Sequence, residues 1–203
     1  MRAFHRALAL GLAGVALVAS SLALASSQSA GGAPPEASPP AALARPTTLC
    51  FVRHAEKEAS SEPKDPTLSA AGRKRALALA ALCSHGPVTH LFASEYRRTR
   101  ETLLPLAEQL GLEVRGVPAG KPGELVRALE ALPEGSVALV AGHSNTLPDL
   151  IARLGGKVEG TTVTNGVATL PDDAFDRLFV LTLPPASARA TVAPSLIELR
   201  YGD

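Results

Sequence analysis

Short apolar segments recur along residues 47–203, and each is bounded by Gly, Pro or charged residues. Their shortness and their content of Val, Leu, Ala and Phe are typical of strands buried in a sheet. The predicted strands comprise residues 48–52, 88–93, 112–117, 136–141, 177–183 and 195–201. The pattern is strongest at 136–141, whereas 112–117 alternates only weakly between apolar and polar residues.

Stretches with helical character lie between the first four of these strands and directly after the fourth. The predicted helices comprise residues 69–82, 94–110, 124–132 and 147–154. Ser69 and Thr146 are of the type that caps a helix start, and Gly111 is of the type that ends one. Alternating strands and helices predict an α/β fold, a three-layer α/β/α sandwich with a mostly parallel sheet. No helix separates the last two strands, so we expect them to form an antiparallel edge.

The first 46 residues have a different composition. Arg2 and Arg6 precede an apolar run over residues 7–19, and small residues follow at 23–25. This pattern predicts a signal peptide over residues 1–25, because the apolar run is too short to span a bilayer comfortably. An uncleaved membrane anchor is the alternative interpretation.

Cleavage after Ala25 would make the protein periplasmic or secreted, with no stable membrane anchor. Residues 26–46 are rich in Ser, Ala, Gly and Pro and predict a flexible linker. The folded domain is therefore expected over residues 47–203.

Composition limits the partners of this domain. The chain has 46% hydrophobic but only 3% aromatic residues, so Ala, Leu and Val must form most of the core. The formal net charge of +1 and the lack of a basic tract argue against nucleic-acid binding. The sequence contains no cluster with metal-ligand spacing. Cys50 and Cys83 could form a disulfide in an oxidising compartment, but two free buried thiols fit the sequence equally well.

Histidine and arginine residues follow three of the predicted strands. Arg53 and His54 come directly after the first strand, Arg98 lies in the helix after the second, and His143 follows residues 136–141. Because the carboxyl ends of parallel strands meet at one edge of a sheet, we expect these side chains to converge. Two guanidiniums can clamp a phosphoryl dianion while one imidazole attacks phosphorus and the other donates a hydrogen bond.

Four motifs in this order resemble the histidine phosphatase superfamily, which has a phosphoglycerate mutase-like fold, over most of residues 48–203. The strand followed by Arg53-His54 resembles the Arg-His-Gly signature of that family. The other three motifs are Leu68-Ser69-Ala70-Ala71-Gly72 at the first helix, Ser94-x-x-x-Arg98-x-x-x-Thr102 at the second, and Gly142-His143.

The resemblance implies that His54 is phosphorylated during turnover and that Arg53, Arg98 and His143 bind the phosphoryl group. We add Asn145, from the turn after His143, as a further predicted phosphate ligand. Ala55 replaces the glycine that follows Arg-His in the family signature.

The acid that protonates the leaving group in many members has no clear match. Glu124 lies in the chain segment where the family usually places this acid, and Glu56, beside the nucleophile, is the other candidate. We favour Glu124.

The predicted function is an exported phosphomonoesterase, a histidine acid-type phosphatase that works through a phosphohistidine and needs no metal or cofactor. Its substrate would be a phosphorylated small molecule or a phosphopeptide. A mutase of the same fold and a binding domain that has lost turnover are the alternatives. Turnover of a generic aryl phosphate would separate the three.

Overall fold

The computed structural model describes residues 44–59 and 64–202. The signal peptide predicted for residues 1–25, and residues 26–43 of the predicted linker, lie outside this part of the chain.

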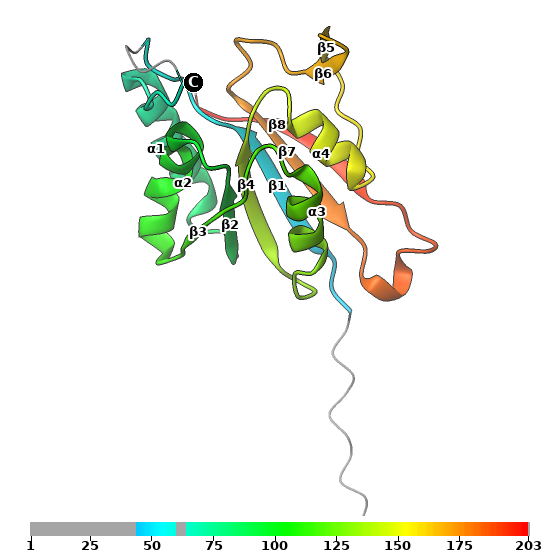
Figure 1. Cartoon of the computed structure of the whole chain (residues 1–203). Coiled ribbons are helices and arrows are strands. Elements are labelled where there is room, and N and C mark those ends of the chain that lie inside the picture. The colour runs from blue at the N-terminus through cyan, green and yellow to red at the C-terminus, as the bar shows by residue number, and fades with distance from the viewer. Residues whose placement is uncertain (1–43, 60–63, 203) are drawn as a thin grey trace, which may run out of the picture. The chain divides into compact units, whose positions relative to one another are not determined.

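A six-stranded mixed sheet forms the centre of the domain (Figure 1). Its strands are β1 (Thr47–Arg53), β2 (His90–Ala93), β3 (Val114–Gly116), β4 (Val137–Gly142), β7 (Arg177–Leu183) and β8 (Ser195–Arg200). They lie in the order β3-β2-β4-β1-β7-β8. The first four are parallel, whereas β7 is antiparallel to both β1 and β8. The predicted α/β architecture with a mostly parallel sheet and an antiparallel edge is confirmed.

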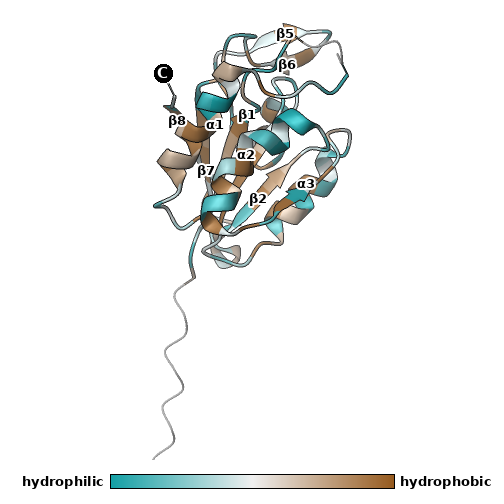
Figure 2. Ribbon diagram, turned by 90° about the vertical axis from the view of Figure 1, so that its left-hand side faces the viewer, coloured by the Kyte–Doolittle hydropathy of each residue, from teal (hydrophilic) through white to brown (hydrophobic). Residues whose placement is uncertain are grey.

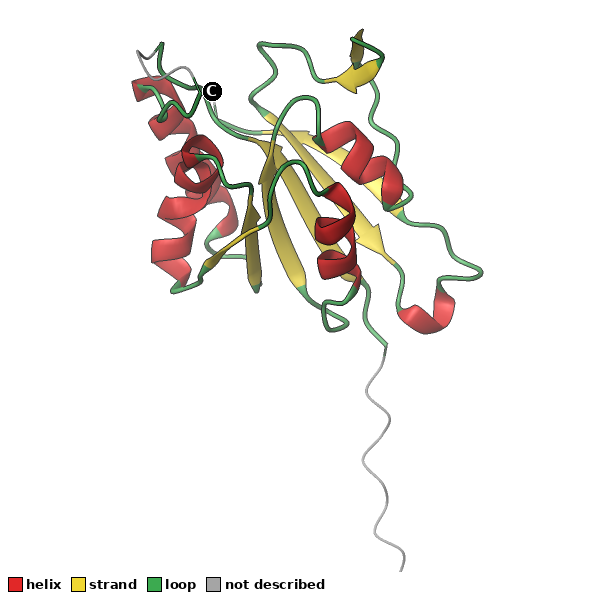
Figure 3. Ribbon diagram, viewed as in Figure 1, coloured by secondary structure: helices red, strands yellow, loops and turns green. Residues whose placement is uncertain are grey.

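Helices cover both faces of this sheet (Figure 3). The helices are α1 (Ala70–Cys83), α2 (Arg97–Leu110), α3 (Pro122–Glu130) and α4 (Leu147–Arg153), with a short 3-10 helix η1 (Ala186–Ala188) before β8. The period of two along a strand divides the core, because successive side chains point to opposite faces. Phe51 of β1 packs on the α3 and α4 side, whereas its neighbour Val52 packs on the α1 and α2 side. Figure 2 shows the strands as mainly hydrophobic, with hydrophilic stretches on the helices around them.

A small hairpin was not predicted from the sequence. It consists of β5 (Thr162–Thr164) and β6 (Val167–Thr169), joined by Asn165 and Gly166 at φ 51° and 78°. Asn-Gly is the preferred pair for a two-residue hairpin turn that needs positive φ at both positions. The signal was therefore present, but the flanking segments are too short and too polar to resemble buried strands.

The second helix begins later than predicted. α2 starts at Arg97 instead of Ser94, with Tyr96 as its N-cap residue. The hydroxyl of Ser94 does not cap this helix, because it bonds Thr99 and a histidine side chain. Ser69 caps α1 as predicted, since its Oγ accepts from the backbone N–H of Gly72 at 3.1 Å.

Of the two alternatives left open for Cys50 and Cys83, the structure has two free thiols and no disulfide between them. They pack against the same core cluster on the α1 and α2 side of the sheet. Burial, assisted by the neighbouring Cys83, raises the pKa of Cys50 to about 11. Thiol oxidation proceeds through the thiolate, so this environment disfavours bridge formation.

Among the described residues, no helix is long and apolar enough to span a membrane.

We expect Gly72→Ala to destabilise the domain strongly. A Cβ at this position would lie 2.1 Å from the backbone carbonyl oxygen of Glu56, and a backbone obstacle cannot rotate away. Overpacking typically costs about 1–3 kcal/mol, and the rigidity of this contact places the loss at or above the upper end. The gain from replacing Gly in a helix, about 1 kcal/mol, is smaller.

Chemical denaturation of the purified protein measures this loss of unfolding free energy. Gly123→Ala is the matched control in α3, because its Cβ would meet only the flexible end of Arg127, at 3.8 Å. An unchanged denaturation midpoint for Gly72→Ala would contradict the expected clash.

Candidate active site

The carboxyl ends of β1 and β4 bring the two predicted site histidines together. In the β1–β4 register Arg53 pairs with Gly142, and the backbone N–H of His54 donates to the Gly142 carbonyl at 2.9 Å. The next residue after each strand end is a histidine, and the ring centroids of His54 and His143 lie 5.4 Å apart. The parallel sheet therefore produces the predicted pairing of these two side chains.

Hydrogen bonding determines which nitrogen of His54 is free. Its Nδ1 lies 2.8 Å from the carbonyl oxygen of Ala55. A carbonyl only accepts, so Nδ1 carries the proton and donates it, and Nε2 retains its lone pair. The Ala55 backbone is itself held from the other side, because its N–H donates to Thr102 Oγ1 at 2.9 Å. His54 is thus prepared as a nucleophile through Nε2.

Burial keeps this imidazole neutral. His54 is only 6% exposed, and burial lowers its pKa to about 3, against the opposing effect of the Ala55 hydrogen bond. The positive charges of Arg98 and Arg53 act in the same direction as burial. An imidazole that stays unprotonated across the physiological range can attack phosphorus without first losing a proton.

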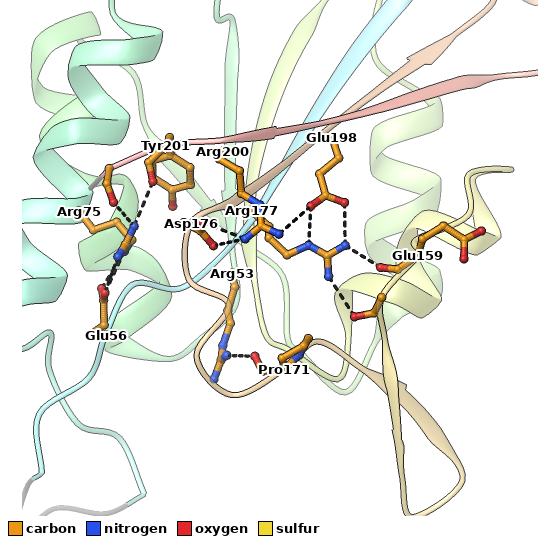
Figure 4. A network of polar contacts seen from close by, with 12 residues as sticks. Arg53, Glu56, Arg75, Glu159, Pro171, Asp176, Arg177, Glu198, Arg200 and Tyr201 are labelled. Carbon is orange, nitrogen blue, oxygen red and sulfur yellow. Dashed lines mark hydrogen bonds and ion pairs between the residues drawn. The ribbon is translucent and has the colours of Figure 1, made fainter.

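Arg53 is held by a loop that lies far away in the sequence (Figure 4). Its Nη1 donates to the carbonyl oxygens of Pro171 and Asp172, both at 2.9 Å. Burial lowers the pKa of the guanidinium, while the Asp172 and Asp173 carboxylates oppose that shift. The buried Nε has no hydrogen-bond partner among the described residues. An unused N–H on a buried guanidinium suits an anion such as a phosphoryl group.

Arg98 approaches the two histidines from the first turn of α2. Its side chain is 15% exposed, and its Nη1 lies 3.9 Å from a carboxylate oxygen of Asp65. Its guanidinium carbon lies 4.3 Å from the ring centroid of Tyr96, which is 5.2 Å from that of His143. Its positive charge acts to lower the pKa of both His54 and His143. The structure therefore brings together four predicted residues, Arg53, His54, Arg98 and His143.

A chain of hydroxyl groups orients His143. Its Nε2 lies 2.9 Å from Ser94 Oγ, which lies 2.8 Å from Thr99 Oγ1, and Thr99 Oγ1 donates to the carbonyl oxygen of Tyr96 at 2.7 Å. The terminal carbonyl only accepts, so this chain is consistent with Nε2 of His143 donating to Ser94. Burial, followed by the charge of Arg98, lowers the pKa of His143 to about 4.

Both predicted acid candidates are engaged elsewhere. Glu56 forms a bidentate pair with Arg75, with a shortest distance of 2.8 Å (Figure 4). Burial acts to raise the pKa of Glu56, but the hydrogen bonds and charge of Arg75 outweigh it and lower that pKa. Glu124 is half exposed at the start of α3 and pairs with Lys121 at 2.8 Å. No described contact joins either carboxylate to His54.

Asn145 also lies apart from the four clustered residues. It is exposed and lines a hollow of about 500 Å³ beside α4 and the β5–β6 turn. His143, two residues earlier, points instead toward Ser94. The direction of side chains in a turn changes from one residue to the next, so proximity in sequence does not bring Asn145 into contact with the histidines.

Sequence reasoning missed three further residues of the site. Phe175 lies beneath the guanidinium of Arg53, Tyr96 lies beneath that of Arg98, and the loop at Asp172 supplies a carbonyl to Arg53. Tyr96 sits inside the second arginine motif and could have been noticed there. Phe175 lies in a polar loop with no motif, so no local signal identifies it.

No group of three or more His, Cys, Asp or Glu side chains within residues 44–59 and 64–202 is arranged to hold a metal ion.

Acidification should destabilise the protein through the two buried histidines. Their folded pKa values of about 3 and about 4 lie below the ordinary value of 6.5, so the unfolded chain binds more protons between these limits. Stability is then fully present above about pH 6.5 and is lost as the pH falls toward 4, by up to about 1.4 kcal/mol per pH unit for each histidine.

Urea unfolding at a series of pH values, without phosphate, measures this loss. His143→Gln should show a shallower decline of unfolding free energy than wild type over the same range. Identical slopes for the two proteins would contradict the assigned burial effect.

Comparisons with known proteins concern the family and the fold of the chain. A protein-family model described as "Histidine phosphatase superfamily (branch 1)" matches residues 49–119. No curated protein sequence matches the chain. Among solved structures, a mycobacterial glucosyl-3-phosphoglycerate phosphatase is 18% identical, with a TM-score of 0.55, covering 75% of this chain and 97% of its own. The protein histidine phosphatase SixA, complexed with tungstate, is 17% identical, with a TM-score of 0.56, covering 75% of this chain and 96% of its own. These likenesses show that the fold is shared.

Proposed function

We propose, from the premise that the chain belongs to the histidine phosphatase superfamily (branch 1), that it is a phosphomonoesterase acting through a phosphohistidine at His54. The observation that carries this proposal is the state of His54. Its Nε2 is unprotonated, the ring is buried, and two guanidiniums and a second imidazole accompany it. This arrangement suits attack on a phosphoryl group held by positive charge.

The first chemical step transfers the phosphoryl group to the enzyme. The lone pair of His54 Nε2 forms a bond to phosphorus, and the bond between phosphorus and the leaving oxygen breaks, with its electron pair remaining on that oxygen. The guanidiniums of Arg53 and Arg98 neutralise the charge on the equatorial oxygens. The hydrogen bond from Nδ1 to the Ala55 carbonyl stabilises the positive charge that develops on the ring.

The second step returns the enzyme to its starting state. The oxygen of a water molecule bonds to phosphorus, the N–P bond breaks, and its electron pair returns to Nε2. Inorganic phosphate is released. A phosphoryl dianion favours a protonated His143 beside it, so this imidazole can donate to an equatorial oxygen while Ser94 accepts from Nε2.

Hydrolysis of p-nitrophenyl phosphate by the purified protein tests this function. We expect steady-state turnover without added metal, and an acid-labile phosphoenzyme in rapidly quenched reactions. A chain that binds phosphate but neither turns over the aryl phosphate nor becomes labelled would contradict the proposal and favour a binding domain.

The leaving group should determine how fast the enzyme works. The carboxylates of Glu56 and Glu124 pair with Arg75 and Lys121. A third carboxylate, that of Glu95, acts to raise the pKa of His143, but it accepts from the backbone N–H of Ala119 at 2.7 Å. We therefore expect little proton donation to the departing oxygen. General acid catalysis is worth about 10²–10⁴-fold, so alkyl phosphates should be turned over slower than aryl phosphates by a factor of that order. Acyl phosphates and phosphoramidates, whose leaving groups depart more easily, would then be favoured.

Comparing kcat/KM for an alkyl and an aryl phosphate in wild type, Glu124→Gln and Glu56→Gln tests this expectation. The alkyl-to-aryl ratio should stay within about threefold of wild type in Glu124→Gln, since the carboxylate pairs on the surface. A selective loss of alkyl activity in either variant would identify that residue as the acid after all.

We also propose that the protein is exported and acts in the periplasm or outside the cell. The support is the N-terminal sequence, which lies outside the described residues: two arginines, an apolar run and small residues before position 26. N-terminal sequencing of the mature protein tests this proposal, with a start at Ser26 expected. An intact Met1 in the cytoplasmic fraction would contradict it.

A further inference from the structure

Each arginine of the site lies over an aromatic ring. The guanidinium carbon of Arg53 is 4.0 Å from the ring centroid of Phe175, and that of Arg98 is 4.3 Å from the ring centroid of Tyr96. We call Phe175 and Tyr96 the backing rings. They come from different parts of the chain, since Tyr96 is the N-cap residue of α2 and Phe175 lies in the loop before β7.

Each backing ring also contacts one of the two histidines. The centroid of Phe175 is 6.1 Å from that of His54, with an interplanar angle of 55°. The centroid of Tyr96 is 5.2 Å from that of His143, at 90°. With the two histidines 5.4 Å apart, the rings form a continuous row that has one arginine at each end.

Packing of the hydrophobic core does not account for the backing rings. Three clusters of buried hydrophobic residues exist in the part of the chain that the structure describes, and neither Phe175 nor Tyr96 is a member of any of them or packs against one. Both rings are only half-buried. Their closest aromatic and cationic neighbours are the four clustered side chains themselves.

An aromatic ring beneath a guanidinium restrains the orientation of the guanidinium plane, and phosphate binding depends on that orientation. The attraction between cation and ring holds the guanidinium plane in place, and bidentate contact with an oxyanion depends on that plane. For Arg53 the restraint is twofold, because the carbonyls of Pro171 and Asp172 occupy Nη1 while Phe175 lies beneath the group. The unpartnered Nε is thereby kept in a defined direction.

We propose that Phe175 and Tyr96 are positioning residues that hold the guanidiniums of Arg53 and Arg98 in the orientation that receives the phosphoryl group. The inference rests on the proposed function for the identity of the ligand. It adds two residues that act through the arginines and not by touching phosphorus.

Paired substitutions separate the effect of the aromatic ring from the effect of the size and apolar character of the side chain. Phe175→Leu and Tyr96→Leu remove the ring, whereas Phe175→Tyr and Tyr96→Phe retain it. We expect each Leu variant to weaken inorganic phosphate binding, measured as competitive inhibition and by calorimetry, and to lower kcat/KM, both by about 3–30-fold, the range that cation–π energies imply. The ring-retaining variants should keep most of the wild-type phosphate affinity and kcat/KM.

Thermal melting of every variant reports whether it remains folded. If Phe175→Leu unfolds, Phe175→Met takes its place.

A double-mutant comparison distinguishes positioning from a separate contribution of the ring. If Phe175 acts through Arg53, Phe175→Leu should not weaken phosphate binding further in an Arg53→Ala protein. Equal losses in both backgrounds, or wild-type phosphate affinity in folded Phe175→Leu, would overturn the inference. Failure of the wild-type protein to bind phosphate or to turn over the aryl phosphate would instead contradict the proposed function.

Discussion

His54→Asn should lose aryl phosphatase activity by about four orders of magnitude or more, the size of effect that follows removal of a nucleophile. Asparagine keeps a polar side chain of similar reach but cannot form the phosphorylated intermediate. The variant should still bind inorganic phosphate, because Arg53, Arg98 and His143 do not depend on the imidazole for their own contacts. Steady-state assays and labelling quenched in alkaline detergent measure the lost turnover and the missing intermediate. Calorimetry with inorganic phosphate measures the retained binding.

The matched control for this substitution is His85→Asn. His85 is exposed at the end of α1, far in the sequence from either site histidine, and its variant should keep wild-type turnover. Detection of an acid-labile phosphoenzyme on His54→Asn, or turnover near that of wild type, would show that another group accepts the phosphoryl.

Arg98→Ala should reduce kcat for the aryl phosphate by about 10²–10³-fold, which corresponds to about 3–4 kcal/mol in the barrier for losing one donor to the transferring group. The effect arises because the charge on the equatorial oxygens grows in the transition state, so this guanidinium contributes most at that point. Arg98→Lys should fall between Ala and wild type, since an ammonium retains the charge but not the planar fork.

Arg97→Ala is the matched control, because Arg97 precedes Arg98 and its side chain is 58% exposed in a pair with Glu101. It should retain most of the activity. Equal losses in Arg97→Ala and Arg98→Ala would mean that general positive charge near the site matters and that the specific placement of Arg98 does not. The melting temperature of each variant shows whether lost activity reflects lost folding.

Local sequence patterns carried the prediction of the fold and of four site residues. Strand periodicity, turn residues and the placement of site residues at strand ends are properties of consecutive residues. Arg53 is the last residue of β1, and His54 and His143 directly follow β1 and β4. Parallel strands with carboxyl ends at one edge then imply that those side chains meet. The same reasoning was unable to detect the short β5–β6 hairpin, whose strands bury no apolar face.

The choice of partner by each ionisable side chain was decided only by tertiary structure. From the sequence, Glu124 was the favoured acid and Glu56 the other candidate, yet Lys121 and Arg75 pair with them in the fold. Asn145 shares a turn with His143 but faces a different hollow. Such outcomes depend on side-chain direction, which changes from one residue to the next and is set by the packing of neighbouring elements.

By itself the sequence determined that this protein is an α/β domain whose arginines and histidines gather at the carboxyl edge of a parallel sheet, because periodicity and strand ends are local properties. Only the tertiary structure decided that Nε2 of His54 is the unprotonated nitrogen, since this requires the Ala55 carbonyl in contact with Nδ1. It also decided what holds Arg53. The carbonyl of Pro171 lies 118 residues away in the chain, and no pattern of neighbouring residues can encode a contact over that separation.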